Sequence, residues 1–449
     1  MRDIYLSTQT TLIITLVVGS FFIALGYINL KKISDNKSHI IGDRNEGIFS
    51  LTTSLSASAL GAWILFGPAS AATWGGIGAV VGYALGTAAP MLFLLNFGPK
   101  IRREFPNGMS LTEFVKRRFG TGILKIILIL ILFYLTIFLI AEVTAIAFLL
   151  DLISKTPLWI TSGLTLIICL LYILRGGFKL SIITDKYQFI IILGIILFSI
   201  FYILGNLEIS SYEIIKKNSP NLLSKSYIPN YTAGLTFFIA VAATNLFHQG
   251  NWQRVFAAKN NIILKKSLIY SSIISFIIVL WMGYTGLISF SIDSNIKPDL
   301  AYFKLMFLNE NILIIVSILI LALALTLSTI DTLINAISSL IIINGKEINK
   351  SLSGKEIKDK SNKLILLLCV IVFVFASEGY SVLYLFLFAD LLCCAAVVTI
   401  FYGFFKKKIN VKLSFISIIL GLSSGLLFFP SQNFQSSLLV GNIMSVENF

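Results

Sequence analysis

The chain has 449 residues, of which 57% are hydrophobic and only 12% charged, and its mean hydropathy is +0.90. Ordinary soluble domains are about 45–50% apolar and roughly 25% charged. The composition therefore excludes a water-soluble enzyme, a disordered chain and a nucleic-acid-binding module, in spite of a net charge of +14. It predicts a polytopic, all-α membrane protein.

Apolar segments long enough to cross a bilayer, about 20 residues each, recur twelve times along the chain. Polar and basic stretches separate them, and the division between the tenth and eleventh falls at 377–380. The predicted spans are 9–30, 48–70, 76–98, 122–150, 157–175, 181–205, 232–256, 266–290, 311–341, 363–378, 379–404 and 412–430.

The loop charges predict an orientation. With the N-terminus outside, the inner loops collect 28 of the 35 Lys and Arg residues and the outer loops seven, which is the bias expected of cytoplasmic loops. Residues 11–30 are followed by Lys31 and Lys32 without a small-residue cleavage site, so we expect no cleaved leader. We expect a multi-pass protein of the plasma membrane, specifically a bacterial inner membrane, with both termini outside and no obligatory protein partner.

The early segment from Ser54 to Gly76 is rich in Gly, Ala and Ser and contains Pro68. Such a stretch is typical of a discontinuous helix, whose unwound carbonyls can coordinate a cation. Plain packing of small residues between helices is the alternative, and it needs no ligand.

Four carboxylates stand out among the predicted spans, where ionisable groups are costly and usually functional. Glu142 and Asp331 lie deep in their segments. For Asp185 and Asp390, a position at a helix end near the lipid headgroups is the alternative.

The run from Ser328 to Thr332 places two hydroxyls and a carboxylate on neighbouring faces of one helix. Hard oxygen ligands suit an alkali cation, whereas a transition metal would require His or Cys. The alternative is that the hydroxyls only bond to carbonyls one turn back. The four cysteines lie in apolar runs, so we expect them to be structural and expect no metal other than sodium.

Three ordered stretches resemble the sodium/solute symporter family, which includes proline, pantothenate, sugar, sialic acid and urea carriers. The first is 54–76, with Trp63 and Gly67 spaced as in proline-type members. The second is the run 174–179 followed by Thr184, Asp185 and Gln188, which is similar to the family's GG…TD..Q pattern. The third, His248 to Arg254 followed by Ala257, Ala258 and Lys259, resembles its Q…QR..AAK pattern.

The resemblance implies a five-plus-five inverted repeat of the leucine-transporter type with one extra helix at each end. The implied divisions are an N-terminal helix and cytoplasmic loop (1–47), a first repeat (48–205), an outer loop (206–231), a second repeat (232–404), and a C-terminal helix and tail (405–449).

Carried over by position, the family's sodium site falls on the carbonyls of Ala57, Leu60 and Leu325 and the hydroxyls of Ser328 and Thr329. A second cation site, present in some members, would fall on Asp185, Ser328, Asp331 and Thr332, with Asp331 replacing a serine. Two carboxylates around one small site either hold one cation tightly or leave one group protonated.

The substrate positions resemble those of the family less closely. Where sugar carriers have the Gln and Glu that bind the sugar, this chain has Ile64 and Tyr83, which argues against a hexose. The substrate candidates are Trp63, Tyr83, Thr244 and Asn245. Asp390 and the run Cys393–Ala396 stand where many members carry a proline.

These observations predict a sodium-coupled symporter that imports a small polar or zwitterionic organic solute by alternating access, with Na⁺ as the coupling ion. The alternatives are a proton-coupled carrier of the same fold and a transporter-like sensory or receptor module. A membrane enzyme is not expected, because the loops contain no catalytic histidine or dense catalytic motif.

Overall fold

The computed structural model describes residues 5–30, 40–207, 209–348, 354–406 and 409–429, which excludes the predicted tail at 431–449 and the basic residues Lys31, Lys32 and Lys37. Over these ranges the chain is helical apart from turns, loops and one isolated bridge between Glu46 and Ala258, so the predicted all-α class is confirmed. The elements are α1 (Thr8–Leu30), α3 (Ile48–Ala59), η1 (Ala62–Leu65), α4 (Gly67–Glu104), α5 (Leu111–Ser154), α6 (Leu158–Gly205), α7 (Ser211–Asn218), η2 (Pro220–Leu223), α8 (Ile228–Phe247), α9 (Gln249–Ala257), α10 (Asn261–Ile292), η3 (Pro298–Leu300), α11 (Ala301–Met306), α12 (Ile312–Ile348), α13 (Gly354–Ser377), α14 (Val382–Tyr402) and α15 (Val411–Leu427).

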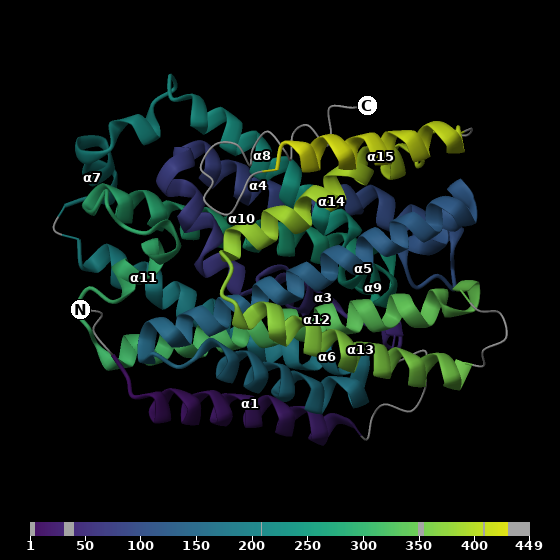
Figure 1. Cartoon of the computed structure of the whole chain (residues 1–449), viewed down its shortest axis with the longest axis horizontal. Helices are drawn as coiled ribbons and strands as arrows, with labels where there is room; N and C mark the ends of the chain where they lie inside the picture. Colours follow the sequence, from purple (N-terminus) through teal and green to yellow (C-terminus); the bar gives the residue numbers. More distant parts are fainter. Residues whose placement is uncertain (1–4, 31–39, 208, 349–353, 407–408, 430–449) are drawn as a thin grey trace.

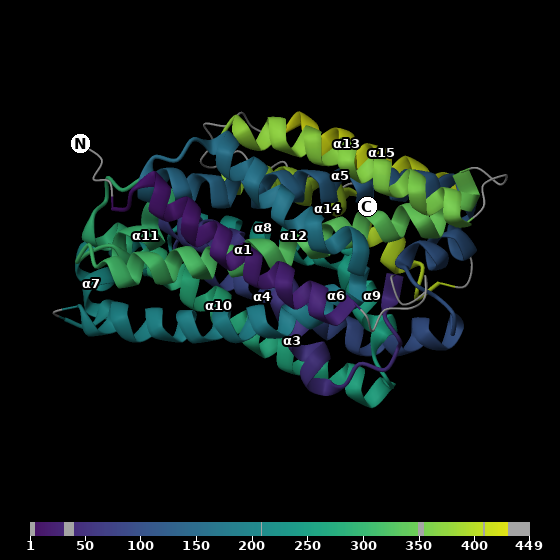
Figure 2. The same cartoon turned by 90° about the horizontal axis from the view of Figure 1, so that it is seen from below.

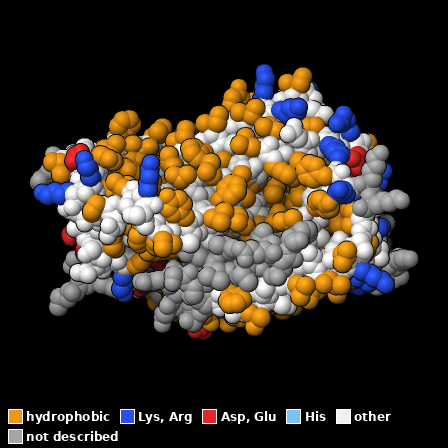
Figure 3. Space-filling model, turned by 90° about the horizontal axis from the view of Figure 1, so that it is seen from above, with side chains coloured by type: hydrophobic (Ala, Val, Ile, Leu, Met, Phe, Trp, Pro, Cys, Tyr) orange, Lys and Arg blue, Asp and Glu red, His pale blue; other side chains and the backbone are white. Residues whose placement is uncertain are grey.

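The long helices run along one axis of the molecule (Figure 1), with apolar side chains between two ends where Lys and Arg gather (Figure 3). Among the described residues, eight helical stretches are long and apolar enough to cross a membrane, and Leu158–Leu171 and α15 are shorter apolar helices. The two remaining predicted spans are interrupted ones, α3 with η1 and α8 with α9. The chain is therefore a multi-pass membrane protein.

Glycines with positive φ mark where consecutive spans meet. Gly76 (φ 60°) bends α4 and Gly177 (φ 57°) bends α6, each at the predicted junction between two spans. Gly379 (φ 73°) separates α13 from α14, so the predicted division in that region is confirmed. A side chain at any of these positions would be strained, because L residues rarely adopt positive φ.

A stripe of small residues brings α4 against α8. A Cβ added at Gly78, Gly82 or Gly86 would lie within 3 Å of the α8 backbone, so only glycine permits this approach. The spacing of four residues places the three on one helix face. Small-residue packing, the alternative for this part of the sequence, thus operates just after the interrupted segment.

The interrupted segment lies inside the bundle rather than at its margin. Helix α3 packs against α6, α10 and α12, and η1 packs against α5 and α12. The helices α1 and α15 lie on opposite margins of the molecule (Figure 1), and Figure 2 shows the same bundle turned by 90°. Side chains from α5, α6 and α12 therefore converge on the break in the first core helix.

Candidate functional site

The first core helix is broken at Leu60 and Gly61. Helix α3 ends at Ala59, both following residues have extended backbone, and Pro68 lies in the first turn of α4 after the short helix η1. Over the ranges described, no hydrogen bond ends on the carbonyl oxygens of Ala57 or Leu60. Buried carbonyls without donors are cation ligands of the kind that discontinuous helices provide. The predicted interruption is therefore present.

Helix α12 brings the predicted hydroxyls to this region with different orientations. The hydroxyl of Thr329 donates to Leu325 O one turn back (3.1 Å), and a Cβ added at Gly61 would lie 2.8 Å from Thr329 Oγ1. Thr329 thus lies against the break, with lone pairs left for a cation. The hydroxyl of Ser328 instead donates to Asp185 Oδ1 at 2.7 Å.

The residues of the predicted second cation site do come together, around a guanidinium. Arg254 is fully buried, and its Nη2 lies 2.9 Å from Asp185 Oδ2 and 3.2 Å from Thr332 Oγ1. Asp331, also buried, accepts from Ser181 at 2.6 Å and from Thr332 at 3.4 Å. A full positive charge therefore stands within hydrogen-bond distance of two of the four candidate ligands, Asp185 and Thr332.

Sequence reasoning placed Arg254 in a family motif but gave it no role. Arg254 lies at the junction of two apolar stretches, and this position could have predicted a buried guanidinium. A buried guanidinium requires a carboxylate, so the sequence could also have predicted an acidic partner for it. The junction itself is capped by His248, whose Nδ1 accepts from Gly250 N at 3.1 Å. Arg254 also donates to Gly250 O at 3.0 Å, which fixes the start of α9 against the cluster.

The predicted substrate residues all line one small cavity beside the break. Trp63 stacks on Tyr83 with ring centroids 5.3 Å apart, and Phe386 meets Trp63 edge-on at 6.5 Å. The cavity measures about 20 Å³ and its lining includes Ser58, Ala59, Trp63, Tyr83, Phe138, Val241, Thr244, Asn245, His248, Phe386 and Asp390.

A carboxylate forms part of this aromatic cavity. Asp390 is 4% exposed, and Thr244 donates a hydrogen bond to its Oδ1. Over the described residues no ion pair reaches Asp390, and the cavity lining contains no Lys or Arg. Asp390 and Asp185 are both buried within the bundle, so neither side chain is exposed at its surface.

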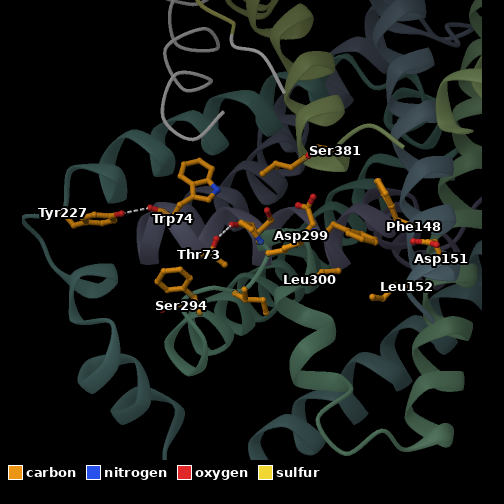
Figure 4. Close-up of a pocket in the computed structure, with 17 residues that line it drawn as sticks. Thr73, Trp74, Phe148, Asp151, Leu152, Tyr227, Ser294, Asp299, Leu300 and Ser381 are labelled. Carbon is orange, nitrogen blue, oxygen red and sulfur yellow. Dashed lines mark hydrogen bonds between the residues drawn. The ribbon is translucent and has the colours of Figure 1, made fainter. Parts of the chain in front are cut away.

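A second, larger cavity, which we call the vestibule, has Trp74, Tyr227 and Asp299 in its lining (Figure 4). It measures about 870 Å³ and includes Phe66, Ser70 and Trp74 of α4 and its N-cap, and Asp299 of η3. Leu383 in its lining is one turn of α14 from Phe386 in the small cavity. Burial raises the pKa of Asp299, and a hydrogen bond with Ser70 works in the opposite direction.

An interrupted helix with free carbonyls, the Thr329 hydroxyl beside it and a small buried cavity close to a larger one are features of membrane transporters. Consistent with this class, the model of the sodium:solute symporter family matches residues 39–421, and the chain belongs to that family. It is therefore a transporter of the symporter class and not an enzyme.

Three similar proteins agree with this assignment. The spermidine transporter DUR31 of Candida albicans is 25% identical over 401 residues, which cover 89% of this chain and 75% of the relative. The structure of a Na⁺-coupled sialic acid symporter in a substrate-bound, outward-open state is similar with a TM-score of 0.76, 17% identity, and coverage of 98% and 96%. A nucleobase-cation-symport-1 family transporter in a closed conformation has a TM-score of 0.55 at 14% identity, with coverage of 92% and 94%. These structures confirm the predicted leucine-transporter-like fold.

Proposed function

We propose that this chain couples the entry of one sodium ion to the import of a small organic solute that carries a protonated amine. The observation that carries the proposal is Asp390, a buried carboxylate in a cavity that is also lined by aromatic rings and contains no Lys or Arg. Aromatic faces and a carboxylate are together the chemistry that recognises an ammonium group. A zwitterionic solute would need a donor for its own carboxylate as well.

Two independent lines support the sodium part of the proposal. The carbonyls of Ala57 and Leu60 are free of hydrogen bonds within the part of the chain described, and Thr329 lies beside them. The family and the Na⁺-coupled neighbour point the same way. We infer one ion at the carbonyls of Ala57, Leu60 and Leu325 and the hydroxyls of Ser328 and Thr329.

We infer that no second cation binds near Asp185 while Arg254 is paired there, so the site predicted at Asp185, Ser328, Asp331 and Thr332 is filled by the protein's own charge. A sodium ion in the same place would stand close to the guanidinium and be repelled. One sodium per transport cycle follows from this reading.

The relative supports an amine as substrate, because that protein is a spermidine transporter. Trp63, Tyr83, Thr244 and Asn245 are then the neighbours of the bound amine. The small cavity holds about one water as it stands, so binding requires Trp63 and Phe386 to move apart.

The orientation follows from the loop charges. We propose that the chain lies in the plasma membrane with both termini outside, because the inner loops would then carry 28 of the 35 basic residues. The vestibule faces outside in that arrangement, and Asp299 at its margin attracts cations. The halves 48–205 and 232–404 would move against each other around the break during alternating access.

Uptake by proteoliposomes tests the proposal. Labelled spermidine, putrescine, choline, proline and urea are each offered under an inward sodium gradient, an inward potassium gradient, or a sodium-free gradient with acid outside. We expect uptake of one or more amines with sodium only. Uptake driven by acid without sodium would favour the proton-coupled alternative, and saturable binding without uptake under any gradient would favour the sensory one.

A further inference from the structure

Glu142, in the C-terminal half of α5, is a buried carboxylate with one oxygen hydrogen-bonded and one oxygen free. Its side chain is fully buried, and Oε2 accepts a hydrogen bond from the backbone N–H of Ala62 at 2.8 Å. Over the described residues, Oε1 has no hydrogen-bond partner. An unpartnered carboxylate oxygen in a membrane interior is costly unless a ligand completes it.

The free oxygen is aimed at the break in the first core helix. A Cβ added at Gly61 would collide with Glu142 Oε1, and the same Cβ would lie 2.8 Å from Thr329 Oγ1. Glu142 Oε1 and Thr329 Oγ1 therefore flank one point of the chain, directly after Leu60. Glycine at position 61 is what leaves this space open.

No cation of the protein neutralises Glu142 within the described ranges. The buried guanidinium of Arg254 is committed to Asp185, Ser54, Thr332 and the carbonyl of Gly250. Glu142 makes no ion pair there. The carboxylate thus offers a hard oxygen and a negative charge at a place where alkali-cation ligands already converge.

We propose that Glu142 is a charged ligand of the coupling ion, which it binds through Oε1 beside Thr329 and the carbonyls of the broken helix. This inference rests on the proposed sodium coupling. The same carboxyl group holds the first N–H of η1 through Oε2, and η1 carries Trp63, which lines the small cavity. One side chain therefore joins the ion to the wall of the substrate cavity.

This bridge predicts how ion and solute affect each other's affinity. An ion on Oε1 fixes the carboxylate, the carboxylate fixes the start of η1, and η1 fixes the Trp63 ring. Sodium should therefore raise amine affinity, and amine should raise sodium affinity by the same factor. A ligand made only of carbonyls and hydroxyls would bind the ion without this link to η1.

The test is Glu142→Gln, which keeps the size of the side chain and an oxygen that can accept from Ala62 N–H but removes the charge. We expect the sodium concentration for half-maximal uptake to rise by at least about tenfold, because a charged oxygen ligand is replaced by a neutral one. In equilibrium binding of labelled spermidine, the increase in affinity caused by sodium should disappear. Glu142→Asp, which keeps the charge, should recover part of both effects.

Thr144→Val is the matched control. Thr144 is buried on the same helix and donates only to Ile140 O of its own turn, at 2.8 Å. This variant should keep the sodium dependence of the unmodified protein. If Glu142→Gln does so too, the inference is overturned while the proposed function stands. If the unmodified protein takes up amines without any need for sodium, the proposed function itself fails.

A measurement on the native protein covers the case in which Glu142→Gln does not fold. The infrared difference spectrum between sodium and potassium, both without amine, should show a perturbed carboxylate stretching band, and Glu142→Asp should change that band. A sodium-induced spectrum without any carboxylate contribution would overturn the inference.

Discussion

Two groups of buried charge lie within the same bundle and are completed in opposite ways. Around Arg254, a guanidinium, the Asp185 carboxylate and several hydroxyls satisfy one another. Around Asp390, a carboxylate receives one hydrogen bond, from Thr244, and lines a cavity together with aromatic, aliphatic and polar side chains. The first group has partners within the chain, whereas on the proposed function the second receives its counter-ion from the bound solute.

The difference separates structural from transport charge. A buried ion pair costs much desolvation and contributes little net stability, but removal of one partner leaves an uncompensated charge. A buried carboxylate without a counter-ion is instead a binding site for a cation that comes and goes. We propose that Asp390 and Glu142 belong to this second kind, Asp390 for an organic cation and Glu142 for an inorganic one.

The largest expected effect is on stability, and it comes from removing the charge of Arg254 from its cluster with Asp185. Arg254→Gln should lower the free energy of unfolding by about 3–5 kcal/mol, because Asp185 is left buried without its partner. Thermal melting of the purified protein in detergent measures this loss. Adding Asp185→Asn to Arg254→Gln should restore most of it, since the pair then vanishes together. If Arg254→Gln alone melts like the unmodified protein, the cluster does not hold the fold.

The second largest expected effect is on amine affinity, and it comes from removing the charge of Asp390. Asp390→Asn should weaken amine affinity about 100-fold, because truncating one partner of a buried charge pair costs roughly 2–5 kcal/mol. Competition binding with spermidine at saturating sodium measures it. The melting temperature should stay the same or rise, in contrast to Arg254→Gln.

Thr399→Val on the same helix is the matched control for Asp390→Asn, since Thr399 is buried, lacks a side-chain hydrogen-bond partner among the described residues and lies outside the cavity lining. It should leave amine affinity unchanged. An Asp390→Asn protein that binds amines as tightly as before would remove the charge argument for the substrate.

A smaller effect is expected on the apparent sodium affinity, from substitutions of Thr329 and Ser328. Thr329→Ala should raise the sodium concentration for half-maximal uptake about tenfold, the loss of one ligand, and Ser328→Ala should raise it less, because that hydroxyl is turned toward Asp185. The Hill coefficient for sodium should be close to one if, as we propose, Arg254 takes the place of a second cation. Ser317→Ala, at the exposed start of α12, is the control. A Hill coefficient near two that Asp331→Ala lowers to one would restore the second cation.

Hydropathy predicted the helices well because each membrane span can be recognised from its own apolar residues, without knowledge of its neighbours in the fold. The twelve apolar stretches correspond to the helices of the structure, and small residues between Ser54 and Gly76 correctly predicted a break. The exact point of the break depends on Gly61, where Glu142 and Thr329 crowd the backbone from α5 and α12. Such crowding is a property of the folded bundle and leaves no periodic signal in the sequence.

The candidate site was predictable in its members but not in its pairings. Asp185, Ser328, Asp331 and Thr332 do converge, yet the sequence did not indicate that Arg254 stands among them. Likewise Glu142 was recognisable as an intramembrane carboxylate, while its position beside η1 depends on how α5 packs across 80 residues of chain. Contacts between residues so far apart in sequence depend on how the helices pack, and local sequence patterns do not predict that packing.

The smallest expected effect lies in the vestibule and depends on pH. Burial raises the pKa of Asp299 above its ordinary value of about 3.9. The folded protein therefore binds this proton more tightly than the unfolded chain does, so the contribution to stability is full below about pH 3.9 and is lost as the pH rises through the raised pKa. Asp299→Asn should remove this loss of stability with rising pH, which a series of melting temperatures from acid to neutral pH would show.

Because the ionised form of Asp299 also adds negative charge to the vestibule, the same substitution should reduce amine uptake slightly at neutral pH and leave it unchanged in acid. An unchanged slope of melting temperature against pH would place the titrating group elsewhere in the vestibule.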